Sequence, residues 1–174
     1  MFKKIILLSL FSICLCSCND KKGQEPEQQS QKIIKSDNKK SSNSIGETLT
    51  PEAKKIVQDW NEYLTIDDLL DDFYSITTDD ALLKARSLSE RAQELKDSIR
   101  IQAFDRPDIK IRLNVLYNNT LRLADMENIS SIETQEIKTE ITNILNAFSA
   151  INSKINNLTS QKYLEKELVD FNDN

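Results

Sequence analysis

The residues best able to do chemistry are three cysteines near the start of the chain, Cys14, Cys16 and Cys18. Thiols at this spacing could form a redox or metal cluster. A metal site needs further Cys or His ligands at a second place in the chain, and the sequence contains no histidine and no other cysteine. The surroundings of the cysteines therefore decide their interpretation.

The cysteines lie at the end of a short apolar segment. Lys3 and Lys4 precede an apolar run at 5–13, and small residues follow it. A bilayer span needs about 20 apolar residues, so this run is too short to cross a membrane. The pattern predicts a secretory signal peptide, with incidental cysteines as the alternative interpretation.

The sequence LCSC at 15–18 resembles the lipobox of bacterial lipoproteins, in which an aliphatic residue and two mostly small residues precede the modified cysteine. Cys18 follows the small Ser17, whereas each of the other two cysteines follows a bulky aliphatic residue. The resemblance therefore selects Cys18 as the modified residue.

This resemblance implies acylation of Cys18 and removal of residues 1–17 as the signal peptide. Lipid chains on Cys18 would anchor the protein in a membrane of the cell envelope. Asn19 follows the cysteine and Asp20 comes one place later. In the enterobacterial sorting pattern this order favours the outer membrane over the inner membrane.

Residues 18–49 predict a disordered tether. They are rich in Gln, Ser, Asn and Lys, and they contain only four aliphatic residues. So little apolar surface cannot offset the entropy of ordering the chain. A flexible coil of this length reaches about 30 Å, which would hold the following domain away from the membrane.

Residues 50–174 predict an all-α domain. No glycine follows Gly46, and beyond it proline occurs only at Pro51 and Pro107, where helices can begin. We expect a kink or a new helix near Thr65. The expected helices cover 50–64, 65–76, 79–104, 107–126 and 130–159, with a terminal segment 160–171 that extends the last helix or folds back.

Apolar residues recur at alternating spacings of three and four along these segments, which is typical of one face of a helix. Ser130 and Glu133 have the spacing of a capping box. The pattern favours an antiparallel up-and-down bundle of three or four helices, with an elongated coiled-coil hairpin as the alternative. The expected core stripes are Ala53, Val57, Trp60 and Leu64; Leu69, Phe73 and Ile76; Ala81, Ala85, Leu88, Ala92, Leu95 and Ile99; Ile109, Leu113, Leu116 and Leu123, widened by Val115 and Tyr117; and Ile137, Ile141, Ile144, Phe148, Ile151, Ile155 and Leu158.

An acidic run at 67–80 is the remaining candidate for metal chemistry. It contains six aspartates, but it lacks the alternating acidic positions and the central glycine of an EF-hand loop. We therefore interpret it as a solvated acidic face with helix-capping aspartates, and we predict no bound metal and no cofactor. Without His, a free mature Cys or a Gly-rich loop, the chain is not expected to be an enzyme; a carboxylate-based, metal-dependent enzyme is the alternative.

The segment 106–128 places positive charge and asparagines on one helix of an acidic protein. Arg112, Asn118, Arg122 and Asp125 form the candidate recognition patch. Arg122 and Asp125 are three residues apart and could pair on one face, which Asn118 would share. The alternative is that these groups bond neighbouring helices.

The charge of the predicted domain argues against nucleic acid as a partner. Residues 50–174 contain 15 Lys and Arg against 23 Asp and Glu, a net charge of −8, whereas phosphate binding needs the opposite sign. A protein partner or self-association is expected. The predicted function is a helical interaction or structural module, and the alternative is an inhibitor or immunity-type lipoprotein that binds a basic protein.

The segments LRLADM at 121–126 and INSKIN at 151–156 resemble the closing helices of short helical lipoproteins from Bacteroidota-type bacteria. No activity is assigned to that family. The resemblance therefore implies a lipoprotein with a helical domain, and no catalytic residue carries over.

Overall fold

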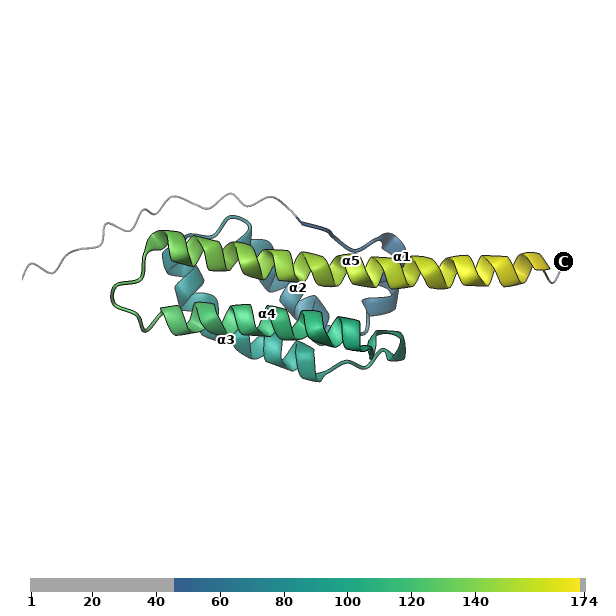
Figure 1. The fold of residues 1–174 in the computed structure, drawn as a ribbon, viewed down its shortest axis with the longest axis horizontal. Helices are drawn as coiled ribbons and strands as arrows, with labels where there is room; N and C mark the ends of the chain where they lie inside the picture. The colour runs from purple at the N-terminus through teal and green to yellow at the C-terminus, as the bar shows by residue number, and fades with distance from the viewer. Residues whose placement is uncertain (1–45, 173–174) are drawn as a thin grey trace, which may run out of the picture. The chain divides into compact units, whose positions relative to one another are not determined.

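Five α-helices build the part of the chain that the computed structural model describes, residues 46–172, with side chains described up to residue 161. No strand occurs within residues 46–172, so the predicted all-α fold is confirmed. The predicted signal peptide, Cys18 and the tether up to residue 45 lie outside the described residues. The elements are α1 (Pro51–Val57), α2 (Asn61–Phe73), α3 (Thr78–Asp97), the 3-10 turn η1 (Gln102–Phe104), α4 (Pro107–Met126) and α5 (Thr134–Asn172) (Figure 1).

Successive long helices run antiparallel and form a bundle. Asp108, near the start of α4, pairs with Lys154 of α5 at 2.8 Å. Arg122, near the end of α4, pairs with Glu140 at 2.9 Å, close to the start of α5. The longest interfaces are those of α4 with α3 and with α5, which lie on either side of it (Figure 1).

Helix starts are set mainly by local chemistry. The Thr50 hydroxyl accepts a hydrogen bond from the backbone N–H of Ala53 at 3.2 Å, and Pro51 occupies the first turn of α1. Pro107 occupies the first turn of α4 in the same way. The expected capping box at Ser130 is wrong, because α5 begins only at Thr134, four residues after Ser130. The backbone N–H of Glu133, just before the helix, donates to the Glu136 carboxylate at 3.0 Å.

The first break between helices falls at residues 58–60 and not near Thr65. Trp60 leaves helical geometry with φ −96° and ψ 79°, which lets its side chain turn into the core. α2 then buries Tyr63 in place of the expected Leu64, which is 41% exposed. Thr65 lies inside α2, where its hydroxyl donates to the carbonyl of Asn61.

The second long helix is also shorter than expected. α3 ends at Asp97, and the chain turns through η1 before α4 begins. Ile99 therefore leaves the helical seam and is only partly buried against the core. Phe104, which no stripe included, is buried because η1 folds it back onto Trp60, with ring centroids 6.1 Å apart.

Most of the predicted stripes are buried and form one core. Val115 is an exception: it is 46% exposed, so it does not widen the apolar face of α4. The core also contains aromatic packing, with the rings of Tyr63 and Phe148 stacked at 5.5 Å. The confirmed core residues include Ala53, Val57, Trp60, Phe73, Ile76, Ala81, Ala85, Leu88, Ala92, Leu95, Ile109, Leu113, Leu116, Leu123, Ile137, Ile141, Ile144, Phe148, Ile151 and Ile155.

Residues 46–50 form a segment that we call the strap. Although 46–49 were expected to belong to the tether, the strap lies along α5 and Leu49 is buried at 8% exposure. Gly46 approaches α5 so closely that a Cβ atom at this position would lie 2.7 Å from the Cβ of Ser149. The packed part of the chain thus includes residues before Thr50.

α5 is the longest helix, with 39 residues and a length of about 58 Å at 1.5 Å per residue. It is one continuous helix, so the terminal segment 160–171 extends it and does not fold back. Its C-terminal part continues past the start of α4 (Figure 1). No helix within residues 46–172 combines the length and the apolar character needed to cross a membrane.

Candidate functional site

The predicted recognition patch on α4 does not form one network. Arg112 donates to the backbone carbonyl of Asp108 in its own helix, with a distance of 2.6 Å from Nη1 to the oxygen. Arg122 turns toward α5 and does not form the pair with Asp125 that the spacing suggested. The reason is that α5 offers a buried carboxylate within reach, whereas Asp125 is exposed to water.

Arg122 belongs to a polar cluster between α4 and α5. Its guanidinium donates to both carboxylate oxygens of Glu140, at 3.2 and 2.9 Å, and to the side-chain oxygen of Asn119 at 2.6 Å. The side chain of Glu140 is only 6% exposed, while that of Arg122 is 54% exposed. Bidentate pairing compensates for burial of the carboxylate.

Two asparagines complete this cluster. Asn119 donates to the backbone carbonyl of Asn143 at 3.0 Å, and Asn143 donates to Glu140 at 3.3 Å. The sequence reasoning missed Glu140 and Asn143, whereas Asn119 is one of the asparagines of 106–128 for which bonding to a neighbouring helix was an expected alternative. A signal was present: Glu140 stands beside Ile141 in the apolar seam of α5, where a charge needs a partner.

Three of the four patch residues do share an exposed row on α4. Asn118, Arg122 and Asp125 are exposed, and they continue a line that starts with two aliphatic side chains. Ile111 is 62% exposed and Val115 is 46% exposed. Their spacings of four, three, four and three place all five on one face, which we call the outer stripe of α4.

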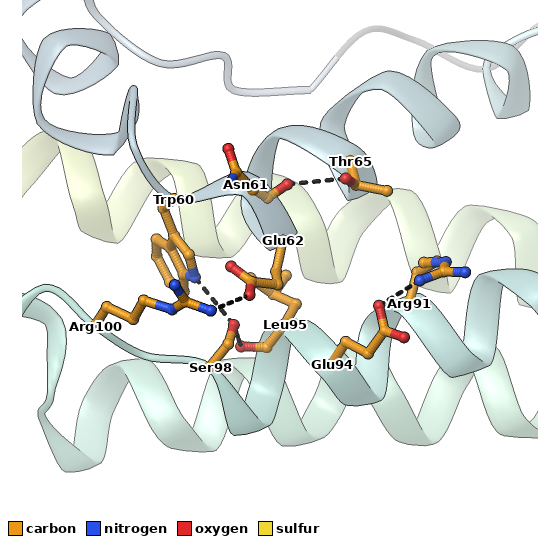
Figure 2. A network of polar contacts seen from close by, with 9 residues as sticks. All are labelled: Trp60, Asn61, Glu62, Thr65, Arg91, Glu94, Leu95, Ser98 and Arg100. Carbon is orange, nitrogen blue, oxygen red and sulfur yellow. Dashed lines mark hydrogen bonds and ion pairs between the residues drawn. The ribbon is translucent and has the colours of Figure 1, made fainter.

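A second polar network lies where α2 meets the end of α3 (Figure 2). Trp60 Nε1 donates to the hydroxyl of Ser98 at 3.2 Å, and Arg100 donates to Glu62 at 2.8 Å. One carboxylate oxygen of Glu62 is buried and has no hydrogen-bond partner within the described residues. Figure 2 shows the Trp60 and Arg100 side chains converging on the same corner of the bundle.

The acidic run does not gather into a metal centre. No group of three or more His, Cys, Asp or Glu side chains suited to a metal ion occurs within the described part of the chain. Asp72 pairs with Lys84 at 2.6 Å, and Asp80 bonds to Thr77 at the start of α3. These contacts agree with capping and surface roles.

Two other aspartates of the run border a small hollow of about 70 Å³. Asp67 and Asp71 line it together with Tyr74, which directly follows α2, Asn152 of α5 and Thr48 of the strap. Burial raises the pKa of Asp67, and the neighbouring charge of Asp71 raises it further. The hollow has room for a few water molecules.

A buried hydrogen bond joins α2 to α5 beside this hollow. The Tyr63 hydroxyl donates to the side-chain oxygen of Asn152 at 2.6 Å. Burial raises the pKa of Tyr63 above its ordinary value, and the charge of Asp67 adds to the shift. Tyr63 therefore stays protonated and serves as a structural donor, not as an acid or base near neutral pH.

Comparison with known proteins finds no matching family model, no similar curated protein and no similar solved structure. The candidate sites therefore rest on their own geometry. The outer stripe of α4 is an exposed row of aliphatic and polar side chains, whereas the Arg122–Glu140 and Trp60–Ser98 networks join neighbouring elements of the bundle.

Proposed function

We propose that this chain is a helical protein-interaction module that is anchored to the bacterial cell envelope through lipid chains on Cys18. The lipobox-like sequence at 15–18 supports the anchor, and its context favours the outer membrane. The predicted tether would hold residues 46–172 away from the membrane surface. Protein contact is favoured over nucleic-acid contact because residues 50–174 carry a net charge of −8.

The observation that carries this proposal is the outer stripe of α4. Ile111 and Val115 expose branched aliphatic side chains next to polar Asn118. Isolated surface aliphatics are common, but here two lie one helical turn apart and in line with charged groups. Such a stripe fits an amphipathic helix of another envelope protein, with aliphatic side chains opposite Ile111 and Val115 and polar groups opposite Asn118 and Asp125.

Catalysis is not part of the proposal. The acidic side chains of α2 and α3 are divided between surface pairs, caps and a small hollow, so they offer no converging set of acid and base groups. The alternative of an inhibitor that binds a basic protein uses the same anchor. It differs in its contact surface, which would be the acidic face of α2.

A photo-crosslinking experiment tests the contact surface. A benzophenone amino acid replaces Val115 in one variant and the exposed α3 residue Glu90 in a control, each in the full chain in native envelopes. We expect the Val115 position to capture one envelope protein that the Glu90 position does not capture. Capture should fall when Ile111 is changed to Ser. Equal capture from both positions, or none from Val115, would contradict the proposal. A third variant carries the crosslinker at Asp68, an exposed residue of α2, and capture from that position instead would favour the inhibitor.

Metabolic labelling with a fatty-acid analogue tests the anchor. We expect Cys18→Ser to abolish labelling, because the acylated atoms are lost with the thiol. Cys16→Ser is the matched control and should still be labelled. Labelling that survives in Cys18→Ser, or that disappears in Cys16→Ser alone, would assign the modification to another cysteine.

A further inference from the structure

Besides the buried Leu49 side chain, the strap is bound to α5 mainly by hydrogen bonds between side-chain amides and main-chain groups. Asn152 donates to the carbonyl of Glu47 at 2.9 Å, and Asn156 donates to the carbonyl of Thr48 at 2.9 Å. The side-chain oxygen of Asn156 accepts from the N–H of Thr50, also at 2.9 Å. The side-chain amide of Asn156 thus forms hydrogen bonds to the strap backbone on both sides of Leu49.

Further contacts extend this attachment in both directions. The N–H of Glu47 donates to the hydroxyl of Ser149 at 2.7 Å, and the Glu47 carboxylate accepts from Asn156 at 3.1 Å. Ser149, Asn152 and Asn156 lie on successive turns of one face of α5, so the strap runs along that face in the direction of the helix. A force that pulls Gly46 away from α5 would therefore act first on the hydrogen bond to Ser149 and last on those to Asn156.

The helix that follows the strap packs mainly on the same neighbour. α1 packs chiefly on α5, with Ala53 and Val57 buried at 0% and 1% exposure. The strap, α1 and the turn after it form residues 46–59, which we call the N-terminal arm. The arm contributes only a few apolar side chains to the core, and those belong to one short helix and one strap residue.

The arm ends at a firmly held residue. Trp60 is 1% exposed, its Nε1 donates to Ser98, and its ring lies 5.6 Å from that of Tyr63 and 6.1 Å from that of Phe104 (Figure 2). These side-chain contacts hold Trp60 to α2, to the end of α3 and to η1. The backbone N–H of Trp60 donates to the carbonyl of Val57 at 2.8 Å, which is its bond to the arm. Loss of the arm would break that bond and leave the side-chain contacts in place.

We infer that the N-terminal arm is a latch that opens as one unit, hinged before Trp60, while α2 to α5 stay folded. Local units with few buried apolar contacts open at lower free energy than the whole domain. Fourteen residues released in extended form add about 50 Å of reach at roughly 3.4 Å per residue. Opening also removes Thr48 from the wall of the hollow at Asp67.

Use of the latch under tension depends on the proposed attachment at Cys18, because only then does pulling on the envelope side reach Gly46. The opening itself does not depend on that attachment. An exchange measurement on the full chain in detergent, without any partner, therefore separates a failure of this inference from a failure of the proposed function.

Native-state hydrogen exchange followed by mass spectrometry tests the latch. In the unmodified chain we expect the amides of residues 47–57 to exchange at least about tenfold faster than those of residues 141–155 in α5. Asn156→Ala removes the amide that grips the strap and should speed exchange at 47–57 by a further factor of about ten. Exchange in α4 should change less than about twofold.

Asn157→Ala is the matched control, because Asn157 is the next residue on α5 and is exposed. It should leave exchange at 47–57 unchanged. The inference would be overturned if residues 47–57 exchanged only together with α4 and α5, or if both asparagine variants had the same effect.

Gly46→Ala gives a second test that leaves α5 intact. Its new Cβ would meet the Cβ and Oγ of Ser149 at 2.7 Å, so the start of the strap must move away. We expect faster exchange at 47–57 with α4 unaffected. An unchanged exchange rate in this variant would show that the strap does not limit opening.

Discussion

α5 is held on two sides in different ways. Toward α4 it presents a continuous apolar seam with two ion pairs, Glu140–Arg122 and Lys154–Asp108, whereas toward the strap it presents a row of amides that bind main-chain groups. The seam depends on side-chain volume and charge, and the strap depends on hydrogen-bond geometry. The comparison teaches that one helix can carry an apolar interface and a hydrogen-bonded one on different faces, and the proposed latch uses the second.

The largest expected effect comes from a change that removes both interfaces together. Ile144 is fully buried in the seam of α5, so Ile144→Asp places a charge where it has no partner. We expect the free energy of unfolding to fall by about 4 kcal/mol or more, a large part of the stability of an ordinary domain. Urea unfolding followed by circular dichroism measures it.

Asn146→Asp is the control for this change, because it introduces the same side chain at an exposed position of α5. It should change stability only slightly. If Ile144→Asp unfolded like the control, the seam would not be the core of the bundle and the contrast between the two faces would fail.

An intermediate effect is expected from the ion pair of the seam. Arg122→Ala leaves Glu140 buried with only the weak bond from Asn143, and we expect a loss of about 2–3 kcal/mol. Glu140→Leu should cost about 1 kcal/mol or less, because the half-exposed Arg122 can return to water.

Thermal unfolding of the two variants measures this asymmetry. Hydrogen exchange at residues 47–57 should stay as in the unmodified chain, since neither residue touches the strap. Equal losses for the two variants would mean that burial of Glu140 is not what makes the pair important.

The sequence predicted the seam well and the strap not at all. Heptad spacing identified Ile141, Ile144, Phe148 and Ile151 because burial on one helix face repeats with the helical period. Leu64 was misassigned because the stripe was extended through a break that Trp60 makes by turning into the core. The strap has no repeating pattern of apolar residues. The amides of α5 bind its backbone N–H and C=O groups, which every residue except proline has, so the sequence gives no signal for this contact.

The candidate site was predicted only in part, for a similar reason. Asn118, Arg122 and Asp125 share a face because of their spacing along one helix, which the sequence shows directly. The partner of Arg122 could not be read in this way. Glu140 lies 18 residues further along the chain, and the pairing requires the antiparallel packing of α4 on α5.

The smallest expected effect is on the stability of the fold at low pH, through Asp108. Hydrogen bonds from Lys154 and Arg106 hold the pKa of Asp108 well below its usual range. Because the folded state lowers this pKa, Asp108 stabilises the fold at pH values above its unfolded pKa, and this contribution is lost as the pH falls through the folded pKa.

Asp108→Asn should therefore weaken the acid dependence of stability and shift the acid unfolding midpoint by only a few tenths of a pH unit, on the order expected for a surface group. Acid titration followed by circular dichroism measures the midpoint. The opening of the strap should not change in this variant. A strap that responded to Asp108→Asn would mean that the two faces of α5 are coupled.

The position of the strap along the chain also sets an order of events during folding. Each of its hydrogen bonds to α5 joins residues that are 102 to 109 positions apart. The strap is synthesised early, whereas the α5 residues that bind it, Ser149, Asn152 and Asn156, are synthesised late. The strap can therefore reach its bound position only after most of the chain has been made. Docking of the strap is accordingly a late step, because contacts between segments far apart in sequence form slowly. The first segment of the domain to be made is thus among the last to reach its final place.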